Sequence, residues 1–333
     1  MPELTAIVPV DLSQRPLDII IKANRLANIA SKAGINIIFG HNDRGTLADA
    51  IFKKLVRRYE RIKISSCRLD SDEINSSLLR NIAARLVQTK YILLLDVDIW
   101  PDFSTILQYL GKVTRGETPF QILPCLYLTK AGSKLLTSGA VDSAELAKRF
   151  IAYSRKEFLH LASPSSVTIL ELKDYQDLLG FDERFKGHGY EDFDFLIRLA
   201  LHYNLITPGT DFLVDKSARS PLFAVGFRKD LGTLCLSALM KFDVVFHLHH
   251  DKPRFGKYHA ARPNNYSLFA TKHQARVDSS VRTPQTLISV FEESCLESGQ
   301  DIHKLSVLYD NKPGHVDRFD TLKRRIRFLI NAQ

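Results

Sequence analysis

Two aspartates, Asp96 and Asp98, directly follow a short apolar run in the stretch Tyr91–Asp102, YILLLDVDIWPD. An unbroken apolar run of this length, bounded by polar residues, is typical of a fully buried strand in a parallel sheet. In an extended chain, residues i and i+2 point to the same side, so the two carboxylates repel each other unless a cation lies between them. Carboxylate oxygens suit a hard divalent ion such as Mg²⁺ or Mn²⁺. We therefore expect a metal site here, although two solvated strand-end carboxylates would give the same pattern.

A second acidic pair, Glu191 and Asp192, follows the glycines Gly187 and Gly189 in the stretch GFDERFKGHGYEDFDFLIRL, residues 180–199. The glycines allow a turn that brings backbone close to a ligand. Apolar residues at helical spacing come next, so the pair lies at the predicted start of a helix. One carboxylate there could act as a general base while the other adjusts its charge and hydrogen bonding. The plainer interpretation is that both acids only complement the helix dipole, which contributes about 0.3–1 kcal/mol.

Three histidines, His247, His249 and His250, lie within four residues in the stretch FDVVFHLHHDKPRFGKY, residues 242–258. The first two would share one face of a predicted strand, and the third would oppose them. An imidazole from this cluster is a candidate ligand for the same metal, with His247 ahead of His249. Lys252 and the cations after it could contact phosphates, or they could form a solvated basic run.

Strands alternate with helices through the first hundred residues. The predicted strands are Leu4–Val10, Ile35–Phe39, Arg61–Cys67 and Tyr91–Leu95, and the predicted helices are Leu17–Ser31, Thr46–Tyr59 and Asn75–Gln88. This order predicts a doubly wound, largely parallel sheet. Ligands of such sheets bind beyond the carboxyl ends of the strands, where Asp43 and Asp96 are expected to lie.

The rest of the chain is less regular. Further strands are expected at Phe120–Leu128 and Val167–Leu172, with mixed, mainly helical structure at Lys134–Ser154. Near the C-terminus, Phe319–Ile330 has an apolar helical face with basic residues elsewhere. Packing of this helix onto the protein is favoured over contact with an anionic membrane, which a basic amphipathic helix can also make.

The composition is that of a globular protein with an anionic partner. The chain has 333 residues, 45% hydrophobic and 25% charged, with a formal net charge of +9. The positive charge suggests a nucleotide diphosphate or an anionic membrane surface, and no basic motif with interleaved aromatic residues favours nucleic acid. The four cysteines form no C-x-x-C pair, and no run has the roughly 18 apolar residues of a membrane span, so a cytoplasmic location is expected.

Taken in order, these motifs resemble those of GT-A glycosyltransferases, similar to the family-two enzymes and the bacterial capsule-biosynthesis transferases. The similarity covers roughly residues 4–258 and includes the opening strand IVPV, Arg80-Asn81 at the family's usual interval before YILLLDVD, and a late strand followed by histidine. The stretch at 180–199 is similar to the galactosyltransferase-type segment G-F-D-E…G-x-G-x-E-D…R-L. The chain departs from many relatives at residues 42–45, which read NDRG instead of Asp-Asp-Gly, and at His188, where tryptophan is common.

The resemblance implies an α/β fold of GT-A type, with a mostly parallel sheet flanked by helices and a C-terminal helical extension. It places the glycosyltransferase domain at residues 1–260, with a nucleotide-sugar half of about 1–130 and an acceptor half of about 131–260. Residues 261–333 would form the mainly helical extension.

The resemblance also implies residue roles. Asp192 would be the catalytic base of an inverting transfer, and Glu191 would orient the acceptor. The predicted ligands of Mn²⁺ or Mg²⁺ are Asp96, Asp98, His247 and His249, and the predicted contacts of a UDP-sugar donor are Pro9, Val10, Asp43, Arg80, Asp96 and Lys252. The acceptor would be an oligosaccharide or lipid-linked glycan of surface polysaccharide synthesis, with peripheral contact at the inner face of the membrane as a further expectation.

Two other functions use similar features. A sugar nucleotidyltransferase can employ a similar sheet and carboxylates, but it commonly has a glycine-rich phosphate loop after its first strand, and VPVDLSQRP lacks the glycines. A non-catalytic carbohydrate-binding protein on the same fold is the third hypothesis. The joint presence of Asp96, Asp98, Glu191 and Asp192 argues against it.

Overall fold

The computed structural model describes residues 3–69, 73–154, 156–216, 218, 220–251, 259–281 and 285–309. The chain forms two compact units, each assembled from three stretches. The first unit comprises residues 1–122, 165–213 and 250–283, and the second comprises residues 123–164, 214–249 and 284–333.

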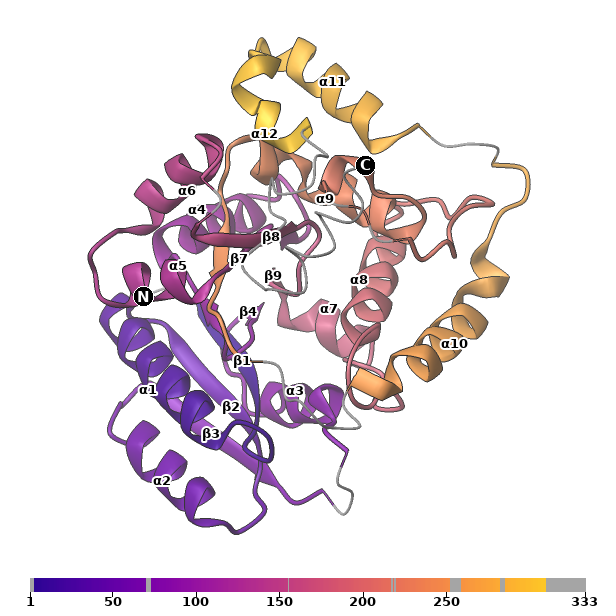
Figure 1. Cartoon of the computed structure of the whole chain (residues 1–333). Helices are drawn as coiled ribbons and strands as arrows, with labels where there is room; N and C mark the ends of the chain where they lie inside the picture. Colours follow the sequence, from indigo (N-terminus) through magenta and orange to yellow (C-terminus); the bar gives the residue numbers. More distant parts are fainter. Residues whose placement is uncertain are drawn as a thin grey trace, which may run out of the picture. The chain divides into compact units, whose positions relative to one another are not determined.

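A six-stranded sheet forms the centre of the first unit, in the order β3-β2-β1-β4-β9-β6 (Figure 1). Its strands are β1 (Leu4–Asp11), β2 (Asn36–Asn42), β3 (Ile62–Cys67), β4 (Tyr91–Leu94), β6 (Gln121–Ile122) and β9 (Thr168–Glu171). The pairs β1–β2, β2–β3 and β1–β4 are parallel, whereas β9 runs antiparallel to β4 and β6. Every residue of β4 is buried, as expected of a strand covered on both faces. The expectation of a mostly parallel α/β sheet flanked by helices is confirmed.

Helices cover the sheet of the first unit on both faces (Figure 1). They are α1 (Pro16–Ala33), α2 (Leu47–Val56), α3 (Ser76–Ala84), α4 (Phe103–Thr114), α7 (Leu172–Asp177), α8 (Glu191–His202) and α10 (Arg262–His273), with the short strand β5 at Ile99–Trp100. Because parallel connections are right-handed, the order 3-2-1-4 puts α1 and α2 on one face and α3 on the other.

Local sequence signals account for the helix boundaries. Pro16 occupies the first turn of α1, and Gly34 ends that helix in the left-handed conformation. Thr46 and Asp49 form a reciprocal capping box at the start of α2, and Asn75 caps α3 through the Leu78 N–H. The sequence predicted these elements to within a few residues.

Gly40 on β2 determines how closely α3 approaches the sheet. A Cβ atom at this position would lie 1.8 Å from the backbone oxygen of Leu79, a distance that no side chain tolerates. The absent side chain therefore lets the α3 backbone rest directly on β2. The next residue of α3 is Arg80, so this contact positions a predicted site residue.

The second unit contains the strands β7 (Cys125–Leu128), β8 (Phe158–Ala162) and β10 (Val245–His247). β7 pairs with β10 in parallel and with β8 in antiparallel fashion. Its helices are α5 (Lys130–Thr137), α6 (Ser143–Ile151), α9 (Phe227–Met240), α11 (Leu287–Ser298) and α12 (Ser306–Tyr309).

One strand prediction is corrected. The run Phe120–Leu128, predicted as one strand, forms β6 and β7, which belong to different sheets. Pro124 lies between them and has no N–H to continue a ladder.

The predicted division at residue 260 stays a prediction. Beyond it, α10, α11 and α12 are helical, whereas Phe319–Ile330 lies outside the described residues. No helix in the described ranges is long and apolar enough to cross a membrane.

Candidate active site

Arg80 joins carboxylates from two distant parts of the chain. Its guanidinium on α3 is 2% exposed, and Nη2 donates to Asp96 Oδ1 at 2.6 Å and lies 3.5 Å from Asp192 Oδ1. The second oxygen of Asp96 accepts from the Ser166 hydroxyl at 2.9 Å. Three residues that the sequence singled out therefore meet in one ion-pair network within the first unit.

The network contains more negative than positive charge. Burial alone would lower the pKa of Arg80, but Asp192, Asp96 and Glu191 outweigh it and raise that pKa. Burial raises the pKa of Glu191, and the charge of Asp192 raises it further. Burial also raises the pKa of Asp192, against which the Arg80 charge acts. A carboxylate whose pKa is shifted toward neutrality is suited to accept a proton.

Several polar atoms of this network have no hydrogen-bond partner among the described residues. They are Nε and Nη1 of Arg80 and Oε2 of Glu191, all buried. Buried polar groups in proteins are nearly always satisfied, so donors and an acceptor left open here are available to a bound molecule. This is the pattern expected of a ligand site and not of a purely structural ion pair.

The chain places Glu191 and Asp192 at the first turn of α8 through a backbone turn. Tyr190, the residue before the helix, has a φ of 73°, in the left-handed region. Further along, the fully buried Asp194 accepts hydrogen bonds from Arg198 at 2.9 Å, Lys272 at 2.9 Å and His273 Nε2 at 3.0 Å. Because two of these partners belong to α10, that helix fixes the orientation of α8.

Asn81 secures the segment that leads into the acidic pair. Its side-chain oxygen accepts from the Phe181 N–H at 2.9 Å and the Tyr175 hydroxyl at 2.6 Å, and its nitrogen donates to the Phe181 carbonyl at 2.9 Å. Gly180 has a φ of +64°, and a Cβ there would lie 2.4 Å from Asn81 Oδ1. Thus Arg80 contacts the carboxylates, and its neighbour Asn81 holds the loop that leads to Glu191 and Asp192.

Asp98 lies in a second cationic cluster. β4 ends at Leu94, and the chain then turns, with the Ile99 N–H donating to the Asp96 carbonyl at 3.0 Å. Asp98 accepts from both terminal nitrogens of Arg15, at 3.2 and 2.7 Å, and from Lys22 Nζ at 2.7 Å. The extended arrangement predicted for Asp96 and Asp98 is therefore corrected. The turn gives each carboxylate its own cation, which relieves their repulsion.

Among the described histidines of the first unit, His250 approaches Asp98. Its Nε2 lies 3.8 Å from Asp98 Oδ2. Its Nδ1 contacts the Asp251 carbonyl at 3.3 Å, which fixes the proton on Nδ1 and makes Nε2 the lone-pair atom. Burial lowers the pKa of His250, which favours the neutral ring. A neutral imidazole with its other nitrogen bonded to a carbonyl, facing a carboxylate, is a donor set that fits a divalent transition-metal ion such as Mn²⁺ better than Mg²⁺, which prefers oxygen ligands alone.

The predicted nucleoside contacts lie at the carboxyl ends of β1 and β2. Val10 is buried, and Pro9 is partly buried. Asp43 accepts from Lys53 at 2.7 Å and from the Gly45 N–H, which hold its pKa below the usual range. Sequence reasoning missed Asp11, the buried carboxylate at the end of β1, although its position after an apolar strand was a usable signal.

The other predicted ligands stay predictions. His247 ends β10 in the second unit and stacks on Tyr127, and the backbone N–H of His249 donates to the Ser133 hydroxyl at 2.7 Å. Lys252 lies outside the described residues.

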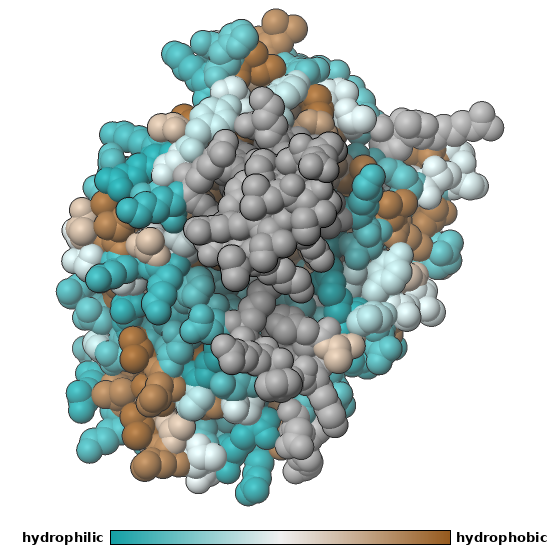
Figure 2. Space-filling model, viewed as in Figure 1, coloured by the Kyte–Doolittle hydropathy of each residue, from teal (hydrophilic) through white to brown (hydrophobic). Residues whose placement is uncertain are grey.

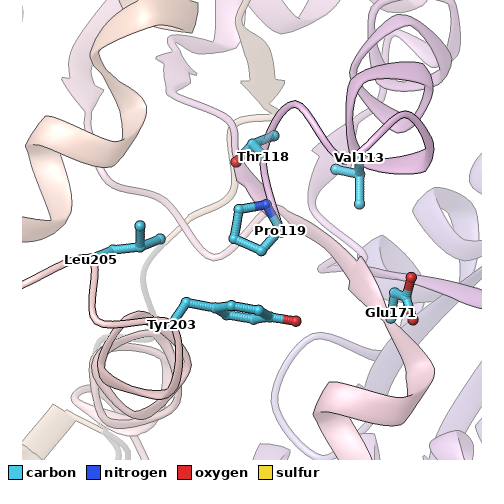
Figure 3. Close-up of a pocket in the computed structure, with 7 residues that line it drawn as sticks. Val113, Thr118, Pro119, Glu171, Tyr203 and Leu205 are labelled. Atoms are coloured by element: carbon cyan, nitrogen blue, oxygen red, sulfur yellow. The ribbon is translucent and has the colours of Figure 1, made fainter.

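A cavity of about 410 Å³ lies in the first unit, with Glu171 and Tyr203 in its lining (Figure 3). The strand register places it at the opposite end of β4 from these carboxylates. Glu171, which lines the cavity, pairs with Tyr91, the first residue of β4. Asp96 lies just beyond the last residue of β4, at the other end of the strand. The polar groups that line it have partners: Thr118 donates to the Phe120 carbonyl, and Glu171 pairs with Lys90 at 3.2 Å. This cavity is therefore not the candidate active site.

Comparison with known families identifies the enzyme class. Residues 58–273, about two-thirds of the chain, match the family described as glycosyltransferase like family 2. The chain belongs to this family. The match includes Arg80, Asp96, Asp98, Glu191, Asp192 and His250, so the carboxylate network lies inside the glycosyltransferase domain. No curated protein matches the chain.

The solved structures to which the chain is similar include glycosyltransferases from two organisms. Residues 1–349 of S. aureus TarS in complex with UDP-GlcNAc are 13% identical, with 98% of this chain and 78% of that chain covered and a TM-score of 0.42. A Drosophila β1,4-galactosyltransferase 7 mutant in complex with manganese, UDP-Gal and xylobiose is 14% identical, with a TM-score of 0.31. That match covers 59% of this chain and 60% of the Drosophila chain.

Family membership and the mixed sheet flanked by helices agree with the GT-A fold that the sequence predicted. The protein is a glycosyltransferase-type enzyme of this family.

Proposed function

We propose that this glycosyltransferase moves a hexose-type sugar from a UDP-sugar to a hydroxyl of a glycan acceptor, with inversion at the anomeric carbon and with help from a divalent ion. The observation that carries the proposal is the Arg80 network, which joins Asp96 beside β4 to Asp192 at the start of α8. It brings the predicted donor-binding and base-supplying carboxylates to the same guanidinium.

Asp192 is the base in this proposal. Its side chain is 30% exposed, so an acceptor hydroxyl can reach it, and its pKa is raised by burial. Asp192 takes the proton as the acceptor oxygen forms a bond to the anomeric carbon. The bond from that carbon to the diphosphate oxygen breaks, and its electron pair leaves with UDP. Attack opposite to the leaving group inverts the configuration.

Glu191 has a different role from Asp192. It is 8% exposed, and burial together with the charge of Asp192 raises its pKa to about 8, so its neutral form is favoured near pH 7. A protonated carboxyl can donate a hydrogen bond, which suits a residue that orients an acceptor hydroxyl without competing for its proton.

Cationic groups stabilise the departing diphosphate. Asp98 and His250 would hold the divalent ion, with Asp96, His247 and His249 as further predicted ligands. When bound, the ion supplies Lewis-acid neutralisation of the charge that develops on UDP. Arg15 and Lys22 adjoin Asp98 and add positive charge at the same place. Arg80 contacts both Asp96 and Asp192, and its charge acts against the rise in the pKa of Asp192 that burial causes.

The test is a panel of nucleotide sugars, with and without Mn²⁺, read out first by thermal shift and then by UDP release and NMR of the product. We expect UDP-sugars to stabilise the protein in the presence of Mn²⁺ and the product to have the inverted anomeric configuration. Formation of UTP and a sugar 1-phosphate when pyrophosphate is added to the UDP-sugar would support a nucleotidyltransferase instead, and absence of nucleotide binding would support a carbohydrate-binding protein. A glycan acceptor of surface polysaccharide synthesis is part of the proposal and is tested by supplying lipid-linked and free oligosaccharides in the same assay.

A further inference from the structure

Four large apolar side chains are exposed on α1 and α2 of the first unit. Leu17 is 72% exposed and Ile21 57% on α1, and Leu47 is 78% exposed and Ile51 39% on α2. Within each helix the two residues are four positions apart, so they lie on one face. Figure 2 shows apolar side chains gathered over the corner that α1 and α2 occupy in Figure 1. Four such residues on two adjacent helices form a contiguous apolar patch, unlike single exposed apolar residues scattered over a surface.

The two helices present the patch at the same end. β1, β2 and β3 are parallel neighbours, so α1 and α2, which connect them, run in the same direction on one face of the sheet. The apolar residues occupy the N-terminal half of each helix. The patch therefore lies toward the carboxyl ends of β1 and β2.

Positive charge follows the apolar residues along each helix. On α2 and just after it, Lys54 and Arg58 continue the face of Leu47 and Ile51, and both are exposed. On α1, Lys32 is exposed beyond Ile21. The acidic residues of these helices do not balance this charge, because Asp49 is buried in its capping box and Asp18 is paired with Arg15 and Lys22.

We propose that the surface formed by Leu17, Ile21, Leu47 and Ile51, with Lys54 and Arg58 beside it, docks the enzyme on an anionic lipid bilayer. An apolar patch bordered by cations matches the two layers of such a membrane, acyl chains below and phosphate headgroups above. A second protein copy would match the apolar residues but would bring the same positive charges against each other. The proposal concerns attachment and does not depend on the catalytic assignment.

The test is co-sedimentation of the full chain with vesicles of phosphatidylcholine alone or mixed with phosphatidylglycerol. We expect binding to the anionic vesicles and its loss at high salt, because each cation near the surface contributes roughly a fivefold gain in affinity.

The double variant Leu17→Gln and Leu47→Gln should bind the vesicles about tenfold more weakly or worse, since neither side chain can then insert into the apolar layer. The matched control is Leu179→Gln with Leu296→Gln, two leucines that are 87% and 84% exposed elsewhere. This control should bind like the unaltered protein.

Three results would overturn the proposal: no binding to anionic vesicles, equal losses in both double variants, or a dimer in light scattering that only the Leu17 and Leu47 changes dissociate. UDP release with a free oligosaccharide acceptor is measured in parallel. A variant that loses vesicle binding but keeps this activity separates docking from catalysis, so failure of one proposal is distinguishable from failure of the other.

Discussion

Replacement of Arg80 by methionine removes the charge that joins the two carboxylates and keeps most of the side-chain length. Arg80 Nη2 lies 3.5 Å from Asp192 Oδ1. At an effective dielectric constant of about 20, unit charges at this separation attract by about 5 kcal/mol, an upper bound because Asp192 is partly exposed. Solvent screening reduces the effect, and we expect the pKa of Asp192 to rise by roughly 1–2 units when the cation is lost.

The consequence is a displaced pH profile. Asp192 acts as a base only when ionised, so a higher pKa moves the acidic limb of kcat/KM to higher pH. At neutral pH, kcat/KM should then fall by about 2- to 10-fold and recover as the pH is raised, because a pKa of about 6 that rises by roughly 1–2 units leaves only about a half to a tenth of Asp192 ionised at pH 7.

The assay is kcat/KM for UDP release from pH 5 to 9, with Arg80→Lys as the matched control. Lysine keeps the positive charge without the guanidinium geometry, so its acidic limb should lie between those of the unaltered protein and Arg80→Met. Thermal unfolding confirms that each variant is folded. An unshifted acidic limb in Arg80→Met, with activity lower by the same factor at every pH, would show that Arg80 does not control the ionisation of Asp192.

Two further predictions concern the metal cluster and the packing of α3. Lys22→Met should strengthen Mn²⁺ binding several-fold in electron paramagnetic resonance titrations, because Lys22 Nζ, 2.7 Å from Asp98, competes with the ion for that carboxylate. Unchanged or weaker binding would show that Asp98 is not a ligand of the ion. Gly40→Ala should lower the free energy of unfolding by roughly 2–3 kcal/mol in urea titrations, since its Cβ would overlap the Leu79 backbone. In the control Gly111→Ala, the new Cβ meets only the end of the Arg115 side chain, so a loss as large as that in Gly40→Ala would contradict the packing argument.

Local pattern was sufficient to predict the first half of the fold. The strands β1, β2 and β4 contain apolar runs between polar turns, and the caps at Thr46 and Asn75 define helix starts from neighbouring residues alone. The failures are also local in origin. The Phe120–Leu128 run is apolar apart from Gln121, so only Pro124 indicated that it divides between two sheets.

The site was predictable in its residue types but not in its pairings. Arg80 and Asp192 are 112 positions apart, and no spacing rule connects them. Asp98 was expected to extend a strand, whereas the turn after β4 directs it to Arg15 and Lys22 from the start of α1. His250 was expected to oppose the other histidines; its proximity to Asp98 depends on how the chain leaves β10, which the sequence pattern does not encode.

The most direct test of the account is the activity of Asp192→Asn, a substitution that keeps the side-chain size and removes the base. The account predicts a folded protein that still binds the UDP-sugar with Mn²⁺ in the thermal-shift assay, while kcat falls by about 10²- to 10⁴-fold, the usual contribution of a general base. Turnover at the unaltered rate, with donor binding intact, would contradict the assignment of Asp192 and with it the role given to the Arg80 network.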